Sequence, residues 1–172
     1  MIHPIPQGHW RPAETLADDV EFALAGSKAW GRITALPPTA DGSLRYDADL
    51  FFAFPLLVPA SVRQHPVAMR GRQGTGPSTS VSITFFVGQR PICRADIGHF
   101  HRDPDNGPLH TGPHLHVATT TFPSLQRGSR SRAYQWLIDP ETELVQAMLN
   151  FGHVLNILGS PTMIQHRLEG AE

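Results

Sequence analysis

The sequence predicts an α+β fold in which a mostly antiparallel sheet has an N-terminal and a C-terminal helix packed on it. Two observations support this class. Apolar residues recur at helical spacing near both ends of the chain, whereas the middle contains short strand-like runs that follow one another directly. The 15 glycines and 16 prolines also indicate frequent turns. Because 172 residues are an ordinary length for one folding unit, we expect residues 1–172 to form a single domain.

The first helix is expected over about residues 12–25. In RPAETLADDVEFALAGS the apolar residues repeat at helical spacing, a proline suits the first turn and a glycine suits the end. The later runs GRITAL, LRYDADLFFAF and SVSITFFVG are rich in β-branched and aromatic residues and predict antiparallel strands. Residues 70–80, which precede the last of these runs, have the composition of a flexible loop that would leave Arg70 and Arg72 exposed at its start.

Two further strands, at residues 90–98 and 114–122, are predicted to form a hairpin around a loop of about fifteen residues. RAYQWLID is then predicted to be a strand ending at Asp139, which can cap a helix over about residues 140–154. The final segment PTMIQHRLE could add an edge strand. The helix carries an apolar stripe that we expect to pack on the sheet, formed by Leu144, Met148, Phe151 and Leu155.

Composition narrows the functional class. The net charge of −1 argues against bulk electrostatic attraction to nucleic acid. Lys28 is the only lysine among 14 basic residues, so the cations are almost all arginines, whose planar guanidinium groups suit phosphate. The sequence shows neither an apolar run of about twenty residues nor a basic and apolar leader, so we expect a cytoplasmic protein with no membrane partner. Cys93 lies in an apolar run and is expected to be buried.

One segment concentrates residues that bind metals and transfer protons. HFHRDPDNGPLHTGPHLH (99–116) holds five of the ten histidines. Residues two apart on a strand share a face, so HLH and HFH would each present a pair of imidazoles, and the nearby aspartates could supply oxygen ligands. Zinc, manganese or nickel would suit such a donor set. The expected ligands are His99, His101, His114, His116, Asp103 and Asp105.

The same segment supports metal-free acid–base chemistry, in which one histidine accepts a proton, another donates one and arginines hold a phosphate. Arg94 and Asp96 share a strand face and should border such a site. A third interpretation is that the polar side chains of the loop only satisfy one another's hydrogen bonds. The candidate catalytic residues are His101, His114, His116, Arg94 and Arg102.

Two resemblances bear on this segment. TGPHLHV is similar to a short stretch of lysostaphin-type zinc peptidases, but the agreement ends after about seven residues and is interpreted as coincidental. Residues 80–157 more broadly resemble an uncharacterised bacterial and phage domain family with R-x-D-x-G, H-R-N-P-D-G and G-P-H-L-H motifs, matched here by RADIG, HRDPDNG and GPHLH. This resemblance implies phage or mobile-element biology and a site at the matching positions, Arg94, Asp96, His101, Pro104, Asp105, His114 and His116.

These observations lead to two hypotheses of function. The first is a small intracellular hydrolase, of ribonuclease type, that acts on a phosphodiester such as RNA. The second is a non-catalytic binding or regulatory module that engages a protein or a nucleic acid, with a structural metal or with none. Either function is compatible with a homo-oligomer.

Overall fold

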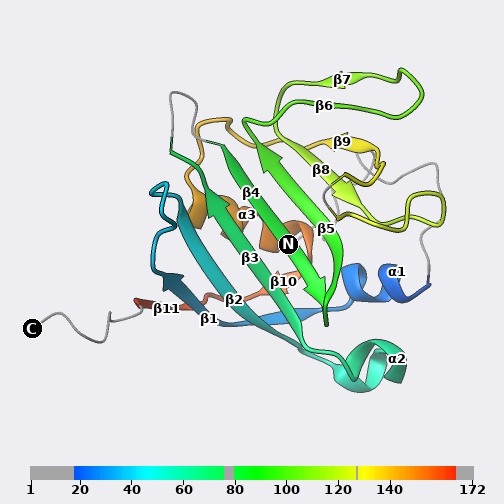
Figure 1. Ribbon diagram of the computed structural model, residues 1–172. Helices are drawn as coiled ribbons and strands as arrows, with labels where there is room; N and C mark the ends of the chain where they lie inside the picture. Colours follow the sequence, from blue (N-terminus) through cyan, green and yellow to red (C-terminus); the bar gives the residue numbers. More distant parts are fainter. Residues whose placement is uncertain (1–17, 76–79, 127, 166–172) are drawn as a thin grey trace, which may run out of the picture.

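The computed structural model describes residues 18–75, 80–126 and 128–165, and its main feature is a nine-stranded sheet (Figure 1). The strands of this sheet pair antiparallel except for the last two along the chain, which pair in parallel with β1. The spatial order is β10 (Ile157–Leu158), β1 (Lys28–Leu36), β2 (Leu44–Phe52), β3 (Val67–Gln73), β4 (Val81–Val87), β5 (Arg90–Ile97), β8 (His114–Val117) and β9 (Ala133–Gln135), with β11 (Thr162–Gln165) also on β1.

The predicted mostly antiparallel α+β class is confirmed, and the hairpin of β5 and β8 is present. The histidine-rich loop between these strands forms a small ribbon of its own beyond the carboxyl end of β5 (Figure 1). The elements outside the main sheet are α1 (Asp18–Ala25), η1 (Pro55–Leu57), α2 (Ala60–Arg63), β6 (His101–Arg102), β7 (Leu109–His110) and α3 (Leu144–Val154).

The helix boundaries differ from those expected. Residues 12–17 of the first predicted helix lie outside the described residues, and α1 covers Asp18–Ala25. The later helix begins at Leu144 rather than at residue 140, because Asp139 closes a turn instead of capping the helix. Strands β10 and β11 follow this helix, and β11 is the edge strand that the final segment predicted.

Arg70 and Arg72 lie on a strand, which corrects the prediction that a flexible loop begins at residue 70. Their exposed side chains alternate along β3 with the buried Val67, Met69 and Gly71, as the two-residue period of a strand requires. The glycine- and serine-rich composition that follows in the sequence concealed the end of this strand.

Helix α3 covers one face of the sheet, where the hydrophobic core lies (Figure 1). Its predicted apolar stripe is fully buried, which confirms that Leu144, Met148, Phe151 and Leu155 pack in the core. The close approach of helix and sheet depends on Gly71 of β3, because a Cβ there would stand 2.7 Å from Sδ of Met148 and 2.8 Å from Cδ1 of Leu144. Cys93 is buried on the same side, as expected.

The opposite face of the sheet carries polar side chains in register. Directly opposed residues on neighbouring antiparallel strands point to the same face, so the pairings align side chains into rows across the sheet. One such row runs across β2, β3, β4, β5 and β8 through Arg45, Arg72, Ser82, Asp96 and His114. No helix among the described residues combines the length and apolar character that crossing a bilayer requires.

Lys28 is fully buried at the start of β1. Its Nζ donates hydrogen bonds to the carbonyl oxygens of Leu24 and Gly26 at the end of α1, and it lies 5.8 Å and 5.6 Å from the ring centres of Phe52 and Phe85. Burial lowers the pKa of this lysine to about 7, because the charged ammonium is poorly solvated in the core.

Replacing Met148 with alanine should lower the free energy of unfolding by about 2–5 kcal/mol, because the change deletes a fully buried side chain and leaves a cavity beside Gly71. Gln146→Ala, on the exposed side of the same helix, is the matched control and should change stability by less than about 0.5 kcal/mol. Urea unfolding of both variants makes the comparison. Equal effects would mean that the stripe does not support the core.

Lys28 should make stability depend on pH. The unfolded chain keeps this lysine protonated up to about pH 10.5, whereas the folded chain releases the proton near pH 7, so stability should rise with pH by up to about 1.4 kcal/mol per unit above pH 7. Lys28→Met should remove this rise. Urea titrations of both proteins between pH 7 and about 8.5 make the comparison, and ionisation of Cys93 in the unfolded state cancels because both proteins contain it. Parallel pH profiles for the two proteins would contradict the assignment.

Candidate metal centre

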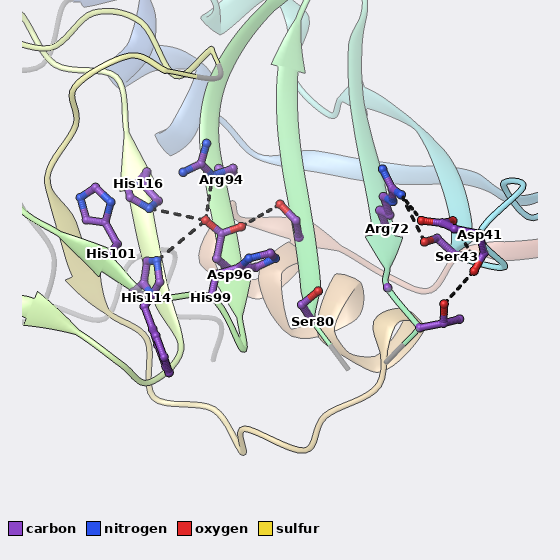
Figure 2. A pocket seen from close by; sticks show the side chains of 14 residues that line it. Asp41, Ser43, Arg72, Ser80, Arg94, Asp96, His99, His101, His114 and His116 are labelled. Carbon is purple, nitrogen blue, oxygen red and sulfur yellow. Dashed lines mark hydrogen bonds and ion pairs between the residues drawn. The ribbon is translucent and has the colours of Figure 1, made fainter. Parts of the chain in front are cut away.

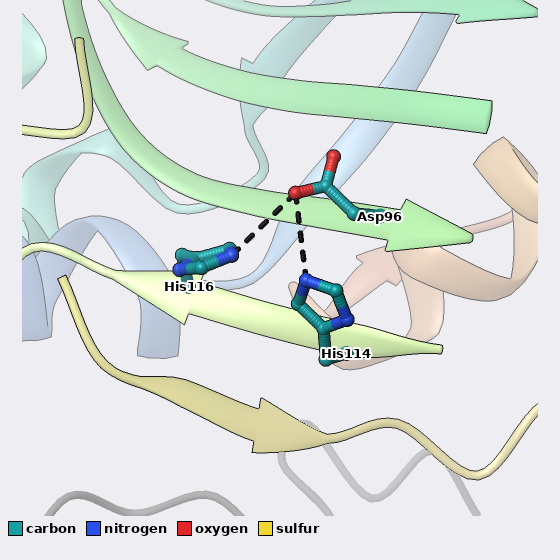
Figure 3. A group of neighbouring side chains, drawn as sticks. All are labelled: Asp96, His114 and His116. Carbon is teal, nitrogen blue, oxygen red and sulfur yellow. Dashed lines mark ion pairs between the residues drawn. The ribbon is translucent and has the colours of Figure 1, made fainter. Parts of the chain in front are cut away.

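Three buried side chains converge where β5 and β8 pair. Asp96 comes from β5, and His114 and His116 come from β8, where the HLH alternation turns both imidazoles toward the carboxylate (Figure 3). One ligand atom from each of the three lies within 4.8 Å of the other two. No other group of three His, Cys, Asp or Glu side chains among the described residues brings its donor atoms so close together.

Each imidazole of this group is oriented through its Nδ1 atom. Nδ1 of His114 lies 2.9 Å from the carbonyl oxygen of Gly112, which can only accept, so this nitrogen carries the proton. Nδ1 of His116 lies 2.9 Å from Oγ of Ser131. The two Nε2 atoms face Oδ2 of Asp96 at 3.8 Å and 3.5 Å, and both are buried without a hydrogen-bond partner. Metal-binding histidines are held in this manner, with the outer nitrogen bonded and the inner one free.

The carboxylate of Asp96 is held from two sides. Oδ1 accepts a hydrogen bond from Oγ of Ser82 at 2.7 Å, and Oδ2 accepts one from Nε of Arg94 at 2.8 Å. Burial alone raises the pKa of Asp96, but the interaction with His116, the charge of Arg94 and the hydrogen bond from Ser82 outweigh it and hold the pKa well below its usual range. The group is therefore an anion at neutral pH.

Both histidines of the group are neutral at the same pH. Burial lowers the pKa of His116 to about 4, although the neighbouring Asp96 carboxylate opposes the shift. Burial also lowers the pKa of His114. An ionised carboxylate beside two neutral imidazoles is the protonation state in which these ligands bind a metal ion.

The donor set fits a divalent transition metal. Two imidazole nitrogens and one carboxylate oxygen suit the zinc, manganese or nickel that the sequence predicted. Three protein ligands leave further coordination positions for water or substrate, as in catalytic rather than structural zinc sites. The sequence predicted that Arg94 and Asp96 border the site; the structure places Arg94 beside the group through its contact with Asp96 and makes Asp96 a member of the group.

His101 lies beside the group without joining it. Its ring centre is 4.5 Å from that of His116 and 6.0 Å from that of His114. Its Nε2 lies 2.8 Å from the backbone carbonyl of Ser131, to which it donates. Asp103 stands between two imidazoles, with Oδ1 at 3.4 Å from Nε2 of His101 and at 3.1 Å from Nε2 of His110. The pairing of His101 with His110 across β6 and β7 creates this second cluster.

The remaining expected site residues lie outside both clusters. His99 is exposed just beyond β5, Asp105 forms a surface ion pair with Arg130 at 2.6 Å, and exposed Arg102 donates to the carbonyl of Gly107. The sequence predicted that the imidazoles of HFH and HLH would form one ligand set. The structure instead groups the two histidines of HLH with Asp96. The HFH run turns into a separate ribbon after β5, so its histidines do not continue the strand alternation.

The group forms one end of an open cleft with a volume of about 670 Å³. Figure 2 shows the histidines and Asp96 at this end and Arg72, Asp41 and Ser43 at the other. Arg72 donates to Oδ2 of Asp41 at 3.1 Å and to Oγ of Ser43 at 3.2 Å. His101 also lines the cleft, so its imidazole is accessible from it.

Sequence reasoning did not anticipate several supporting residues. Ser82 and Ser131, which orient Asp96 and His116, come from segments distant along the chain. For Asp96 the sequence offered one signal, the strand alternation that places its side chain on the same face as that of Arg94. His110 was assigned no role, because its partner Asp103 is defined only by the fold of the ribbon.

Comparison of the chain with protein-family models, with curated proteins and with solved structures finds no match. The resemblance of residues 80–157 to a bacterial and phage domain family therefore stays a prediction. Function has to be inferred from the geometry of the candidate metal centre and its cleft.

Adding Zn²⁺ or Mn²⁺ to protein stripped with a chelator should raise its melting temperature. An ion at a hundred times its dissociation constant stabilises the folded state by about 2.7 kcal/mol. His114→Gln should abolish most of this gain, because it replaces one of the three donors. His99→Gln is the matched control, since His99 lines the cleft outside the group. Calorimetric titration checks stoichiometry, and equal metal responses of both variants would contradict the assigned ligands.

Proposed function

We propose that this protein is a metal-dependent hydrolase of phosphodiesters such as RNA. The observation that supports a metal-binding function is the pair of buried Nε2 atoms of His114 and His116, which face an ionised carboxylate without hydrogen-bond partners. Leaving a buried polar atom unpaired costs about 1–3 kcal/mol. A bound cation would remove this cost for both imidazoles, whereas a purely structural hydrogen-bond cluster would leave it in place.

The charges of the cleft favour an anionic substrate. Among the described residues that line it, Arg72 and Arg94 are balanced by Asp41 and Asp96, and the histidines of the metal centre are neutral. A divalent cation would leave the cleft with two positive charges in excess. A phosphate diester carries one negative charge and oxygens that both a metal ion and a guanidinium can bind.

The protein supplies a group for proton transfer next to the centre. His101 donates Nε2–H to the carbonyl of Ser131, so in its neutral ring Nδ1 is unprotonated and can accept a proton. A divalent ion held by the three ligands would act as a Lewis acid toward a phosphoryl oxygen. Asp103 lies 3.4 Å from Nε2 of His101 and would stabilise the imidazolium that forms.

The reaction would exchange one phosphorus–oxygen bond for another. Water, or the 2′-hydroxyl of RNA, forms the new bond to phosphorus and gives its proton to Nδ1 of His101. The bond to the leaving oxygen breaks, that oxygen takes up a proton from solvent water, and the imidazolium of His101 returns its proton to the solvent. Arg94, which borders the centre through its contact with Asp96, would balance the charge that develops on the phosphoryl oxygens.

The metal-loaded protein should hydrolyse bis(4-nitrophenyl) phosphate and a mixed RNA substrate. His116→Gln should lower kcat/KM by about a hundredfold or more, because glutamine is a poor substitute for a ligating imidazole. His153→Gln, on the exposed side of α3, is the matched control and should keep full activity. Steady-state rates with each metal and with a chelator test the proposal.

The chelator separates the alternatives. Loss of hydrolysis on chelation supports the metal-dependent reaction. Hydrolysis that survives chelation would replace it with metal-free catalysis by the histidines. No hydrolysis of either substrate by wild-type protein with any of the three metals would overturn the proposed function in favour of a binding module.

A further inference from the structure

The polar face of the sheet continues the cleft with a set of arginines. The row that contains Asp96 and His114 extends through Ser82 on β4 to Arg72 on β3 and Arg45 on β2. Opposed residues in such a row share a face, so the two arginines and the metal centre lie on the same side of the sheet. Arg45, on β2, therefore lies on the face of the candidate metal centre at a distance of three strands from Asp96.

A second row runs beside the first. Arg70 on β3 pairs with Thr84 on β4, which pairs with Arg94 on β5, and Arg94 pairs with His116. The guanidinium of Arg70 lies 5.0 Å from the ring centre of Phe86, so an aromatic and a planar cation stack on the open face. Both rows therefore end at the candidate metal centre, and each carries an arginine on β3, although Arg70 is paired on β2 with Asp47.

These side chains surround a hollow of about 370 Å³ that adjoins the cleft. Arg72 and Ser82 line both, so the two depressions adjoin each other on the polar face of β2 to β5, and together they are called the groove. Three arginines line the hollow, and Asp47 is the one acidic residue among the described residues around it. Arg72 is also paired with Asp41 of the cleft, so the hollow keeps an excess of one positive charge, whereas the whole chain has a net charge of −1.

The dimensions of the sheet relate this groove to a polymer. Neighbouring strands lie about 4.8 Å apart, so Arg72 and Arg45 are about 10 Å and 14 Å from Asp96 along the row. A stacked single strand of nucleic acid advances about 3.4 Å per nucleotide. The two arginines would thus meet phosphates about three and four nucleotides from a phosphodiester at the metal centre.

We infer that this groove binds single-stranded polynucleotide, with the scissile phosphate at the metal centre and flanking phosphates on Arg45, Arg70 and Arg72. The inference rests on the proposed function and extends it from phosphodiesters in general to a polymer. Guanidinium forks match phosphate oxygens, and the stacked Arg70 and Phe86 offer a platform for a base, which an acidic peptide would not use. A paired duplex does not expose the faces of its bases to such a platform.

The test compares oligoadenylates of 2, 4, 8 and 12 nucleotides with bis(4-nitrophenyl) phosphate on the zinc- or manganese-loaded protein. KM should fall at least tenfold between the dinucleotide and the octanucleotide, because the longer chain reaches the arginines. Arg70→Gln and the Arg45→Gln/Arg70→Gln pair should reduce this length preference about threefold and tenfold. Arg63→Gln, an exposed arginine on α2, is the matched control and should retain the preference.

Binding of fluorescent dodecaadenylate to chelator-treated protein, followed by anisotropy, gives a readout independent of catalysis. The slope of log K against log salt should weaken by about 0.7 for each arginine removed. Hydrolysis of the small diester without a length preference would overturn the groove but keep the proposed function. Length-dependent binding without hydrolysis of any substrate would overturn the proposed function but keep the groove. Equal competition by poly-glutamate at matched charge would overturn the preference for nucleic acid.

Discussion

The candidate metal centre depends on the register between β5 and β8. Asp96 is paired with His114, and Arg94 with His116, so one alignment of the two strands brings every member of the centre together. The intervening Ala95 and Leu115 are also paired and fully buried on the core face. A slip of one residue would move the imidazoles into the core and Leu115 to the cleft. The hydrophobic core on one face of the sheet thus fixes the geometry of the polar site on the other face.

Burial and the neighbouring hydrogen-bond donors then set the protonation states of Asp96, His114 and His116. A buried carboxylate is stable as an anion only when donors surround it, and Arg94 and Ser82 supply them to Asp96. The imidazoles are held neutral by burial, with their outer nitrogens bonded to Gly112 and Ser131. In His114 this division leaves the lone pair of Nε2 directed inward and the proton on Nδ1 directed outward, which is an arrangement suited to a cation.

The sequence was informative wherever function follows from strand alternation. It predicted the β5 and β8 hairpin, the shared face of the HLH pair and the buried stripe of α3, because each depends on neighbours along the chain. It did not reveal that Asp96 completes the centre, or that Asp105 turns away to pair with Arg130. Those outcomes depend on strand register and on the fold of the β6 and β7 ribbon, which relate residues far apart in sequence.

One face of the sheet packs in the hydrophobic core, and the other carries the polar side chains of the candidate site. Helix α3 fits closely against one face because Gly71 lacks a side chain, while the residues next to Gly71, Arg70 and Arg72, point the other way. The same strand alternation that makes room for the helix therefore directs two arginines into the groove. Because β3 is an inner strand, the backbone that carries these arginines is hydrogen-bonded on both sides. Binding of a polymer to the proposed groove would therefore need no rearrangement of the strands that carry it.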